Sequence, residues 1–307
     1  MPQARSTTPA ATSGPGRRRR RLAVLLGWVF AVELVVAAAV PLEAERGIGI
    51  RPAQLVTPPH GQISPATKSL NVGDRTVRLT ALGGPAGDRL LSRVASGIGA
   101  AITAVEAFWG VDWSRDISVV ATRTNEEFRA AAGGGPAAQW ADIAAVTVVD
   151  RVDPAHRVAA GQRIVFAPGA ANMTAEALRI VLTHELFHYA ARVDTAPDAP
   201  QWLTEGVADF VARPPAPVPA DALPVPLTLP SDAELDGPGP QRSLAYDRAW
   251  WFARFVADTY GPAKLHDLYL AVCGVGRTDV PSAVHDVLAT DSPGLLVRWH
   301  AWLAHPG

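Results

Sequence analysis

The sequence feature that most constrains the fold is a pair of histidines, His184 and His188, in the segment V-L-T-H-E-L-F-H-Y (residues 181–189). On an α-helix, residues four apart lie on one face about one turn apart, so both imidazoles can direct a nitrogen at a single metal ion. Glu185 follows the first histidine and is rotated about 100° from it, which places its carboxylate beside the ion rather than among the ligands. The pattern predicts a zinc site in which Glu185 is the general base.

A short motif of this kind also arises by chance, so a third ligand is needed to support it. The next predicted helix, residues 201–212, contains the segment W-L-T-E-G-V-A-D-F. Glu205 would complete a site of two histidines and one carboxylate, with a fourth position open for water. Asp209 lies one turn further along the same face. It is suited to accept a hydrogen bond from the free ring N–H of a ligand histidine, which fixes the tautomer and orientation of the ring.

The N-terminal region carries a second strong signal. Five consecutive arginines, residues 17–21, precede an apolar run at residues 22–40, whose 19 residues are near the length that crosses a bilayer as a helix. Positive charge on the N-terminal side predicts a disordered cytoplasmic tail, residues 1–21, and an extracytoplasmic body. We expect an uncleaved anchor, because the run is longer than the usual signal-peptide core of about 7–15 residues. The alternative is a signal peptide cleaved near residues 37–39, which would make the protein secreted.

Composition excludes several other kinds of function. The formal net charge is −1, and the basic residues form no stripe outside the arginine run, so we expect no nucleic-acid partner. The chain has one cysteine, Cys273, which excludes an internal disulfide and any metal site built from several cysteines.

Hydrophobic periodicity predicts an α+β fold, with strands in the first half and helices in the second. Residues 41–70, rich in Pro, Gly and polar residues, are expected to be an extracytoplasmic spacer. Residues 71–307 are expected to form one domain, with a strand-rich half (71–194) that includes the motif helix and a helical half (195–307). The predicted strands are residues 75–82, 117–121, 143–149 and 163–166.

The predicted helices are residues 88–109, residues 125–132 with Asn125 as N-cap, a motif helix beginning near Thr174, residues 201–212, residues 243–260 and two more before the C-terminus. Nine prolines lie between residues 214 and 240, which predicts a connection without regular structure.

H-E-L-F-H-Y together with P-Q-W-L-T-E-G-V-A-D-F resembles the gluzincin metallopeptidases, in particular the peptidase MA-like domains that are distantly similar to the catalytic domains of thermolysin and aminopeptidase N. The likeness is specific over residues 181–210 and extends in outline over residues 75–305. It implies a thermolysin-like zincin catalytic domain, in which a mixed sheet and an active-site helix are followed by a helical subdomain. It also implies Zn²⁺ as cofactor and a peptide or protein as substrate.

A weaker likeness covers L-A-Y-D-R-A-W-W-F-A-R-F-V-A-D-T-Y-G, residues 244–261. Enzymes of the aminopeptidase N type have a tyrosine at the start of a similar helix that stabilises the oxyanion, which implies this role for Tyr246; the residue could instead cap a buried helix. The G-x-M-x-N segment that anchors a substrate amino terminus in aminopeptidases is absent, which favours an endopeptidase. In the resemblance, residues 143–149 line the cleft and could pair with an extended peptide, although an ordinary sheet strand is the alternative.

These features predict a membrane-anchored extracytoplasmic zinc peptidase, attached through residues 22–40. Two alternatives stay open. One is a catalytically degenerate module that keeps the fold and serves as a binding protein, although the presence of the whole set of site residues argues against it. The other is a zinc hydrolase that acts on a non-peptide bond.

Overall fold

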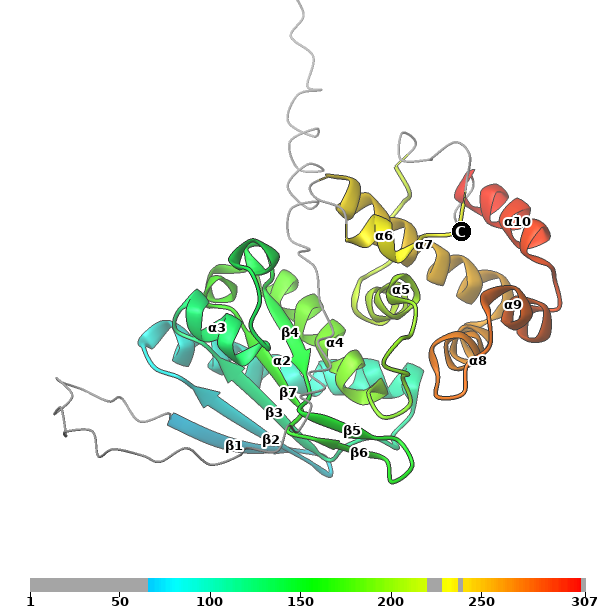
Figure 1. Ribbon diagram of the computed structural model, residues 1–307. Helices are drawn as coiled ribbons and strands as arrows, with labels where there is room; N and C mark the ends of the chain where they lie inside the picture. Colours follow the sequence, from blue (N-terminus) through cyan, green and yellow to red (C-terminus); the bar gives the residue numbers. More distant parts are fainter. Residues whose placement is uncertain (1–65, 220–227, 237–239, 305–307) are drawn as a thin grey trace, which may run out of the picture.

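The computed structural model of the chain describes residues 66–219, 228–236 and 240–304 (Figure 1). The predicted cytoplasmic tail, the membrane anchor and most of the predicted spacer lie outside these residues. The described part is an α+β fold, in which strands dominate the first half and helices the second, as the sequence predicts.

A five-stranded mixed sheet organises the first half, with the strand order β1-β2-β3-β7-β4. The inner pairs, β2 with β3 and β3 with β7, are parallel, whereas β1 and β4 lie at the two edges and run antiparallel to their neighbours. Two further strands, β5 and β6, form a separate antiparallel ribbon. The bounds are β1 (Ala66–Val72), β2 (Arg75–Ala81), β3 (Asp116–Ala121), β4 (Ala145–Val148), β5 (Arg151–Asp153), β6 (Val158–Ala160) and β7 (Arg163–Phe166).

Helices cover both faces of the sheet because its inner strands are apolar on both sides. Helices α2 (Pro85–Trp109) and α4 (Ala175–Ala191) pack on one face, and α3 (Asn125–Ala131) with the 3₁₀ turn η1 (Ala137–Trp140) covers part of the other. Along β7, Ile164 and Phe166 belong to the core under α2 and α4, while Val165 between them belongs to the smaller core under α3. This alternation is the period of two that a strand imposes.

The second half is helical and packs against α4 (Figure 1). Helix α5 lies between α4 and α7, and α7 in turn contacts α6, α8 and α10. The bounds are α5 (Gln201–Ala212), α6 (Asp232–Leu235), α7 (Pro240–Tyr260), α8 (Pro262–Cys273), α9 (Val280–Leu288) and α10 (Ser292–Ala304); the 3₁₀ turn η2 (Pro168–Asn172) precedes α4.

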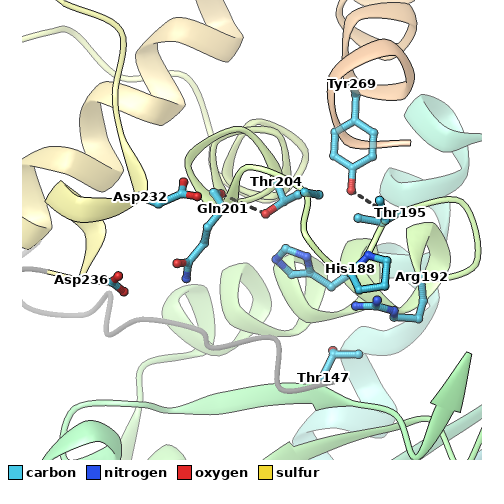
Figure 2. Close-up of a pocket in the computed structure, with 12 residues that line it drawn as sticks. Thr147, His188, Arg192, Thr195, Gln201, Thr204, Asp232, Asp236 and Tyr269 are labelled. Atoms are coloured by element: carbon cyan, nitrogen blue, oxygen red, sulfur yellow. Dashed lines mark hydrogen bonds between the residues drawn. The ribbon is translucent and has the colours of Figure 1, made fainter. Parts of the chain in front are cut away.

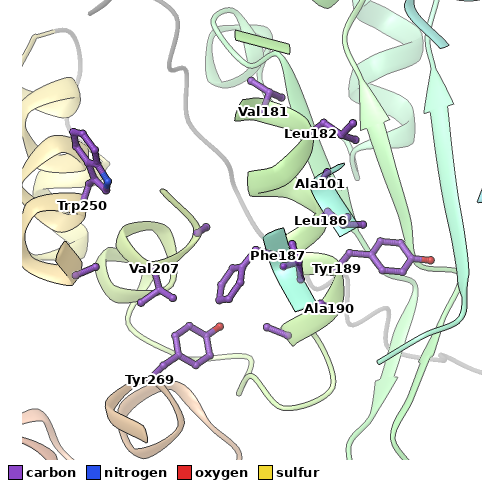
Figure 3. Close-up of a cluster of buried hydrophobic side chains, with 14 of the residues drawn as sticks. Ala101, Val181, Leu182, Leu186, Phe187, Tyr189, Ala190, Val207, Trp250 and Tyr269 are labelled. Carbon is purple, nitrogen blue, oxygen red and sulfur yellow. The ribbon is translucent and has the colours of Figure 1, made fainter. Parts of the chain in front are cut away.

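Helix α4 is enclosed on nearly all sides, with 13 of its 17 residues buried. Figure 3 shows Leu186 and Tyr189 directed toward the sheet and Phe187 directed toward Val207 of α5 and Tyr269 of α8. The rings of Phe187 and Tyr269 meet edge to face at 5.6 Å. Because the helix is buried all round, its polar residues depend on neighbouring side chains rather than bulk water for hydrogen bonds.

Helix α2 is long and apolar enough to cross a membrane by length and composition. Its apolar face, however, packs on the sheet and on α4 through residues such as Val94, Ile98 and Val105, each fully buried. We therefore interpret α2 as the central core helix of the domain.

Several predicted boundaries need correction. Strand β1 begins at Ala66, so the last residues of the predicted spacer belong to the sheet. Its residues 67–69 are exposed and only Leu70 and Val72 pack on the core, which explains why no alternating apolar pattern marks it. The β5–β6 ribbon occupies the predicted loop after β4, again with largely exposed residues.

The helix boundaries differ in three places. Thr124, rather than Asn125, caps α3, because its extended backbone allows its hydroxyl to accept from the Glu127 amide at 3.2 Å. One helical turn, α6, interrupts the proline-rich connection, and its N-cap Ser231 forms a reciprocal capping box with Glu234. Three helices follow α7, one more than predicted. The cap of α4 at Thr174 is confirmed, since its hydroxyl accepts from the Ala177 amide at 3.1 Å.

Candidate metal centre

The contact between α4 and α5 brings together the three residues that the sequence spacing predicts as ligands. His184 and His188 project from one face of α4, and Glu205 projects from α5. The two Nε2 atoms lie 3.2 Å apart. Nε2 of His184 lies 3.2 Å from Glu205 Oε2, and Nε2 of His188 lies 3.6 Å from Glu205 Oε1.

These spacings match the requirements of a tetrahedral zinc site. Zinc bonds of about 2.0–2.1 Å to nitrogen and oxygen place the ligand atoms about 3.3–3.4 Å from one another at the corners of a tetrahedron. The two Nε2 atoms lie 3.2 Å apart, and His184 Nε2 lies 3.2 Å from Glu205 Oε2, both close to that value; His188 Nε2 lies 3.6 Å from the other carboxylate oxygen, Oε1. The donor set, two imidazoles and one carboxylate, is one that zinc accepts. The group is therefore able, by geometry and by donor type, to hold this ion.

Burial strengthens the electrostatic character of the centre. The side chain of Glu205 is fully buried, and those of His188 and His184 are 6% and 12% exposed. A carboxylate removed from water in this way is costly unless positive charge or hydrogen-bond donors compensate it. Two imidazoles aimed at the same carboxylate fit a site in which a cation completes the compensation.

Asp209, one turn after Glu205 on α5, holds the other nitrogen of a ligand histidine. Its Oδ1 lies 3.0 Å from Nδ1 of His184, so Nδ1–H donates to the carboxylate and the lone pair of Nε2 is left facing Glu205. Arg213 donates to Oδ2 of Asp209 at 3.0 Å and to Asp247 at 2.9 Å. Burial alone would raise the pKa of Asp209, but Arg213 and His184 outweigh it and the pKa is lowered.

Glu185, the predicted general base, is 2% exposed. It receives a hydrogen bond from β4, a contact that the sequence pattern does not predict. The hydroxyl of Thr147 on β4 lies 2.8 Å from Glu185 Oε2 and 2.8 Å from the Glu185 carbonyl oxygen. Thr147 shares its face of β4 with Ala145, the face that turns toward α4. The only signal in the sequence was one polar residue within an apolar strand.

A cavity of about 270 Å³ adjoins the centre (Figure 2). It is bounded by Thr147 of β4, by His188 of α4, by Arg192 at the C-cap of that helix, and by residues of α5, α6 and α8. The cavity therefore adjoins the centre on the side of His188, a candidate ligand, and of Thr147, which bonds to Glu185.

Tyr246, predicted as an oxyanion donor, is 7% exposed and lies on α7, which packs on α5. It is outside the set of described residues that line the cavity, and its role stays a prediction. Tyr189, which follows His188, belongs to the sheet contact instead, since its hydroxyl donates to the Asp116 carbonyl oxygen at 2.9 Å.

Comparison with known proteins gives no family for this chain: neither a protein-family model nor a curated protein matches it. The interpretation of the centre therefore depends on its own geometry and chemistry.

Proposed function

We propose that this chain is a zinc-dependent peptidase whose metal is held by His184, His188 and Glu205. The observation that carries the proposal is the convergence of the two Nε2 atoms and the Glu205 carboxylate, with separations of 3.2 Å between the nitrogens and of 3.2 and 3.6 Å from them to the two carboxylate oxygens, beside the buried carboxylate of Glu185. When bound, zinc would supply Lewis acidity that polarises a carbonyl group and makes water more acidic.

The chain's own residues would then handle the proton and the geometry. Glu185 accepts a proton from the attacking water and returns it to the leaving amine. Thr147 holds the Glu185 carboxylate in position through the 2.8 Å hydrogen bond. Asp209 fixes the tautomer of His184, and Tyr246 donates to the developing oxyanion.

A thermolysin-like, gluzincin-type catalytic domain is the arrangement we propose for this chemistry. A mixed sheet, a motif helix lying on it and a following helix that contributes a glutamate support this assignment. The assignment also supports an endopeptidase. Among the described residues β4 is an edge strand next to α4, so its outer side is suited to pair with an extended peptide.

We further propose that the domain is extracytoplasmic and anchored through residues 22–40, because five arginines precede this apolar run.

The substitution Glu185→Gln tests the mechanism. It removes the basic oxygen but keeps the shape of the side chain, so zinc content and thermal stability should change little, whereas turnover should fall by roughly a hundredfold or more. Cleavage would be followed by mass spectrometry on a proteome-derived peptide mixture. Glu176→Gln, which changes an exposed glutamate in the first turn of the same helix, is the matched control and should retain full turnover.

Full activity of Glu185→Gln on a peptide that the parent cleaves would show that the mechanism is wrong. A zinc-loaded parent that cleaves no peptide but hydrolyses esters would favour a non-peptide hydrolase, and one that hydrolyses neither would favour a binding module.

A further inference from the structure

Arg192 is a buried cation beside the centre, one turn after His188 at the C-terminal end of α4. The residue is 5% exposed, and its Nε and Nη2 atoms have no hydrogen-bond acceptor among the described residues. Burial lowers the pKa of the guanidinium, but arginine starts so high that it stays charged at neutral pH. A buried charge without a partner is unfavourable, although the C-terminal end of a helix offsets part of this cost.

Other buried arginines in the described part of the chain are compensated. Arg75, 2% exposed, pairs with Glu106 at 2.9 Å, and Arg248, 5% exposed, pairs with Glu234. Arg254, 6% exposed, donates to the Ala216 carbonyl oxygen and lies over the ring of Trp250. Each of these three guanidinium groups has a carboxylate or carbonyl acceptor, whereas the Nε and Nη2 atoms of Arg192 have none among the described residues. Such an exception is typical of a group whose partner is a ligand.

The position of Arg192 shows where that ligand would lie. Arg192 lines the cavity on the same side as Thr195 and Tyr269, whose hydroxyls lie 2.8 Å apart and engage each other. Asp232 and Asp236 lie at the other end of the cavity, across His188 (Figure 2). The cavity is thus positive at one end and negative at the other. An anionic group that enters it is attracted to the Arg192 end and repelled from the α6 end.

We propose that Arg192 binds a carboxylate of the substrate, and that the enzyme therefore prefers peptides with a carboxylate close to the bond that is cleaved. The carboxylate comes from an acidic side chain or from the free C-terminus of a short peptide. The cleavage preference rests on the proposed peptidase function, whereas the binding of the carboxylate does not.

Binding measurements with paired probes test the site without cleavage. The first pair, acetyl-Ala-Ala-Glu-amide and acetyl-Ala-Ala-Gln-amide, tests binding of a side-chain carboxylate. The second pair, acetyl-Ala-Ala-Ala and its C-terminal amide, tests binding of a C-terminal carboxylate. Calorimetric titration would use the full-length, zinc-loaded chain carrying Glu185→Gln. We expect the carboxylate member of one pair to bind at least about tenfold more tightly than its amide, since charge-assisted hydrogen bonds to arginine are strong.

Adding Arg192→Met should reduce that ratio to about one. Arg277→Met, which removes an equal charge from a half-buried arginine that pairs with Asp198, should leave the ratio unchanged. The Arg192→Met variant should also melt no lower than its parent, because an apolar side chain of similar length replaces an uncompensated buried cation.

Equal affinities within both pairs would overturn the site, and so would the absence of measurable binding of any probe at millimolar concentration. A carboxylate preference that survives in Arg192→Met would also overturn it, because the probe would then be binding the metal instead. If Arg192→Met does not fold, the carboxylate preference can still be measured in the parent. Arg192→Gln then serves as the second variant. A carboxylate preference in a chain that cleaves no peptide would support this site and reject the peptidase proposal. Peptide cleavage without a carboxylate preference would support the peptidase proposal and reject this site.

Discussion

At the scale of single residues, the candidate centre depends on side chains that orient other side chains. Asp209 of α5 holds His184 of α4 by its Nδ1, and Thr147 of β4 holds the carboxylate of Glu185. Each of these hydrogen bonds crosses between two elements and lies in a buried environment, where such bonds are strong and costly to leave unmade. The fold itself therefore orients the carboxylate of Glu185, the proposed base.

Thr147→Val tests this orientation. Valine has nearly the same shape but no hydroxyl, so Glu185 loses the hydrogen bond from Thr147 at Oε2. Turnover should fall between about tenfold and a hundredfold, because small misplacements of a catalytic group are costly, while zinc content stays unchanged. Thr147→Ser keeps the hydroxyl and should retain most of the activity. Equal turnover in the valine and serine variants would show that the hydroxyl has no part in orienting the base.

The residues named from the sequence are those whose relation is set within a helix. His184 and His188 share a face by their spacing, as do Glu205 and Asp209, and the structure brings the two pairs together. Thr147 could not be predicted in the same way. Its contact with Glu185 spans 38 residues and depends on which face of β4 meets α4. Arg192 carried no sequence signal either, since only burial shows that it lacks an acidic partner.

At the scale of elements, the position of Glu205 depends on how closely α5 approaches α7. Gly206 makes the approach possible, because a Cβ at this position would lie 2.5 Å from the Ala249 carbonyl oxygen and 2.7 Å from its carbon. Both atoms belong to the backbone of α7 and cannot move aside without shifting the helix. A residue adjacent to a candidate ligand thus sets the spacing of two helices.

Gly206→Ala should therefore destabilise the fold by about 1–3 kcal/mol, the usual cost of overpacking. It should also weaken zinc binding, because the displaced helix carries Glu205. Gly97→Ala is the matched control: it too lies in a helix, but its new Cβ would only touch Leu182 at 3.9 Å. Alanine there should stabilise the fold by up to about 1 kcal/mol through helix propensity. Chemical denaturation measures the free energy of unfolding of both variants. Equal values would contradict the close approach of α5 to α7 at Gly206.

The elements that could be predicted are those with strong periodicity and clear ends. Strand β7 and helix α5 lie where the sequence places them, and Thr174 caps α4 as predicted. Strand β1 was missed because an exposed edge strand needs few apolar residues. The β5–β6 ribbon was missed for the same reason, and α6 because one capped turn is too short to show periodicity.

At the scale of the whole molecule, the proposed topology has the α+β domain outside the membrane. The five arginines before residues 22–40 predict that the C-terminal body is exported. A reporter that works only in an extracytoplasmic compartment should therefore be active when it is fused after Gly307. A reporter that works only in the cytoplasm when fused at the same position would reverse the proposed topology.

The central claim is that His184, His188 and Glu205 hold one zinc ion, and metal analysis of the purified full-length chain tests it most directly. We expect about one zinc per chain in the parent and nearly none in His188→Ala, because two ligands cannot replace three. His285→Ala removes an exposed histidine that pairs with Asp286 and should keep the full zinc content. A parent without zinc after growth and purification in zinc-containing medium, or a His188→Ala variant that keeps as much zinc as the parent, would contradict the account.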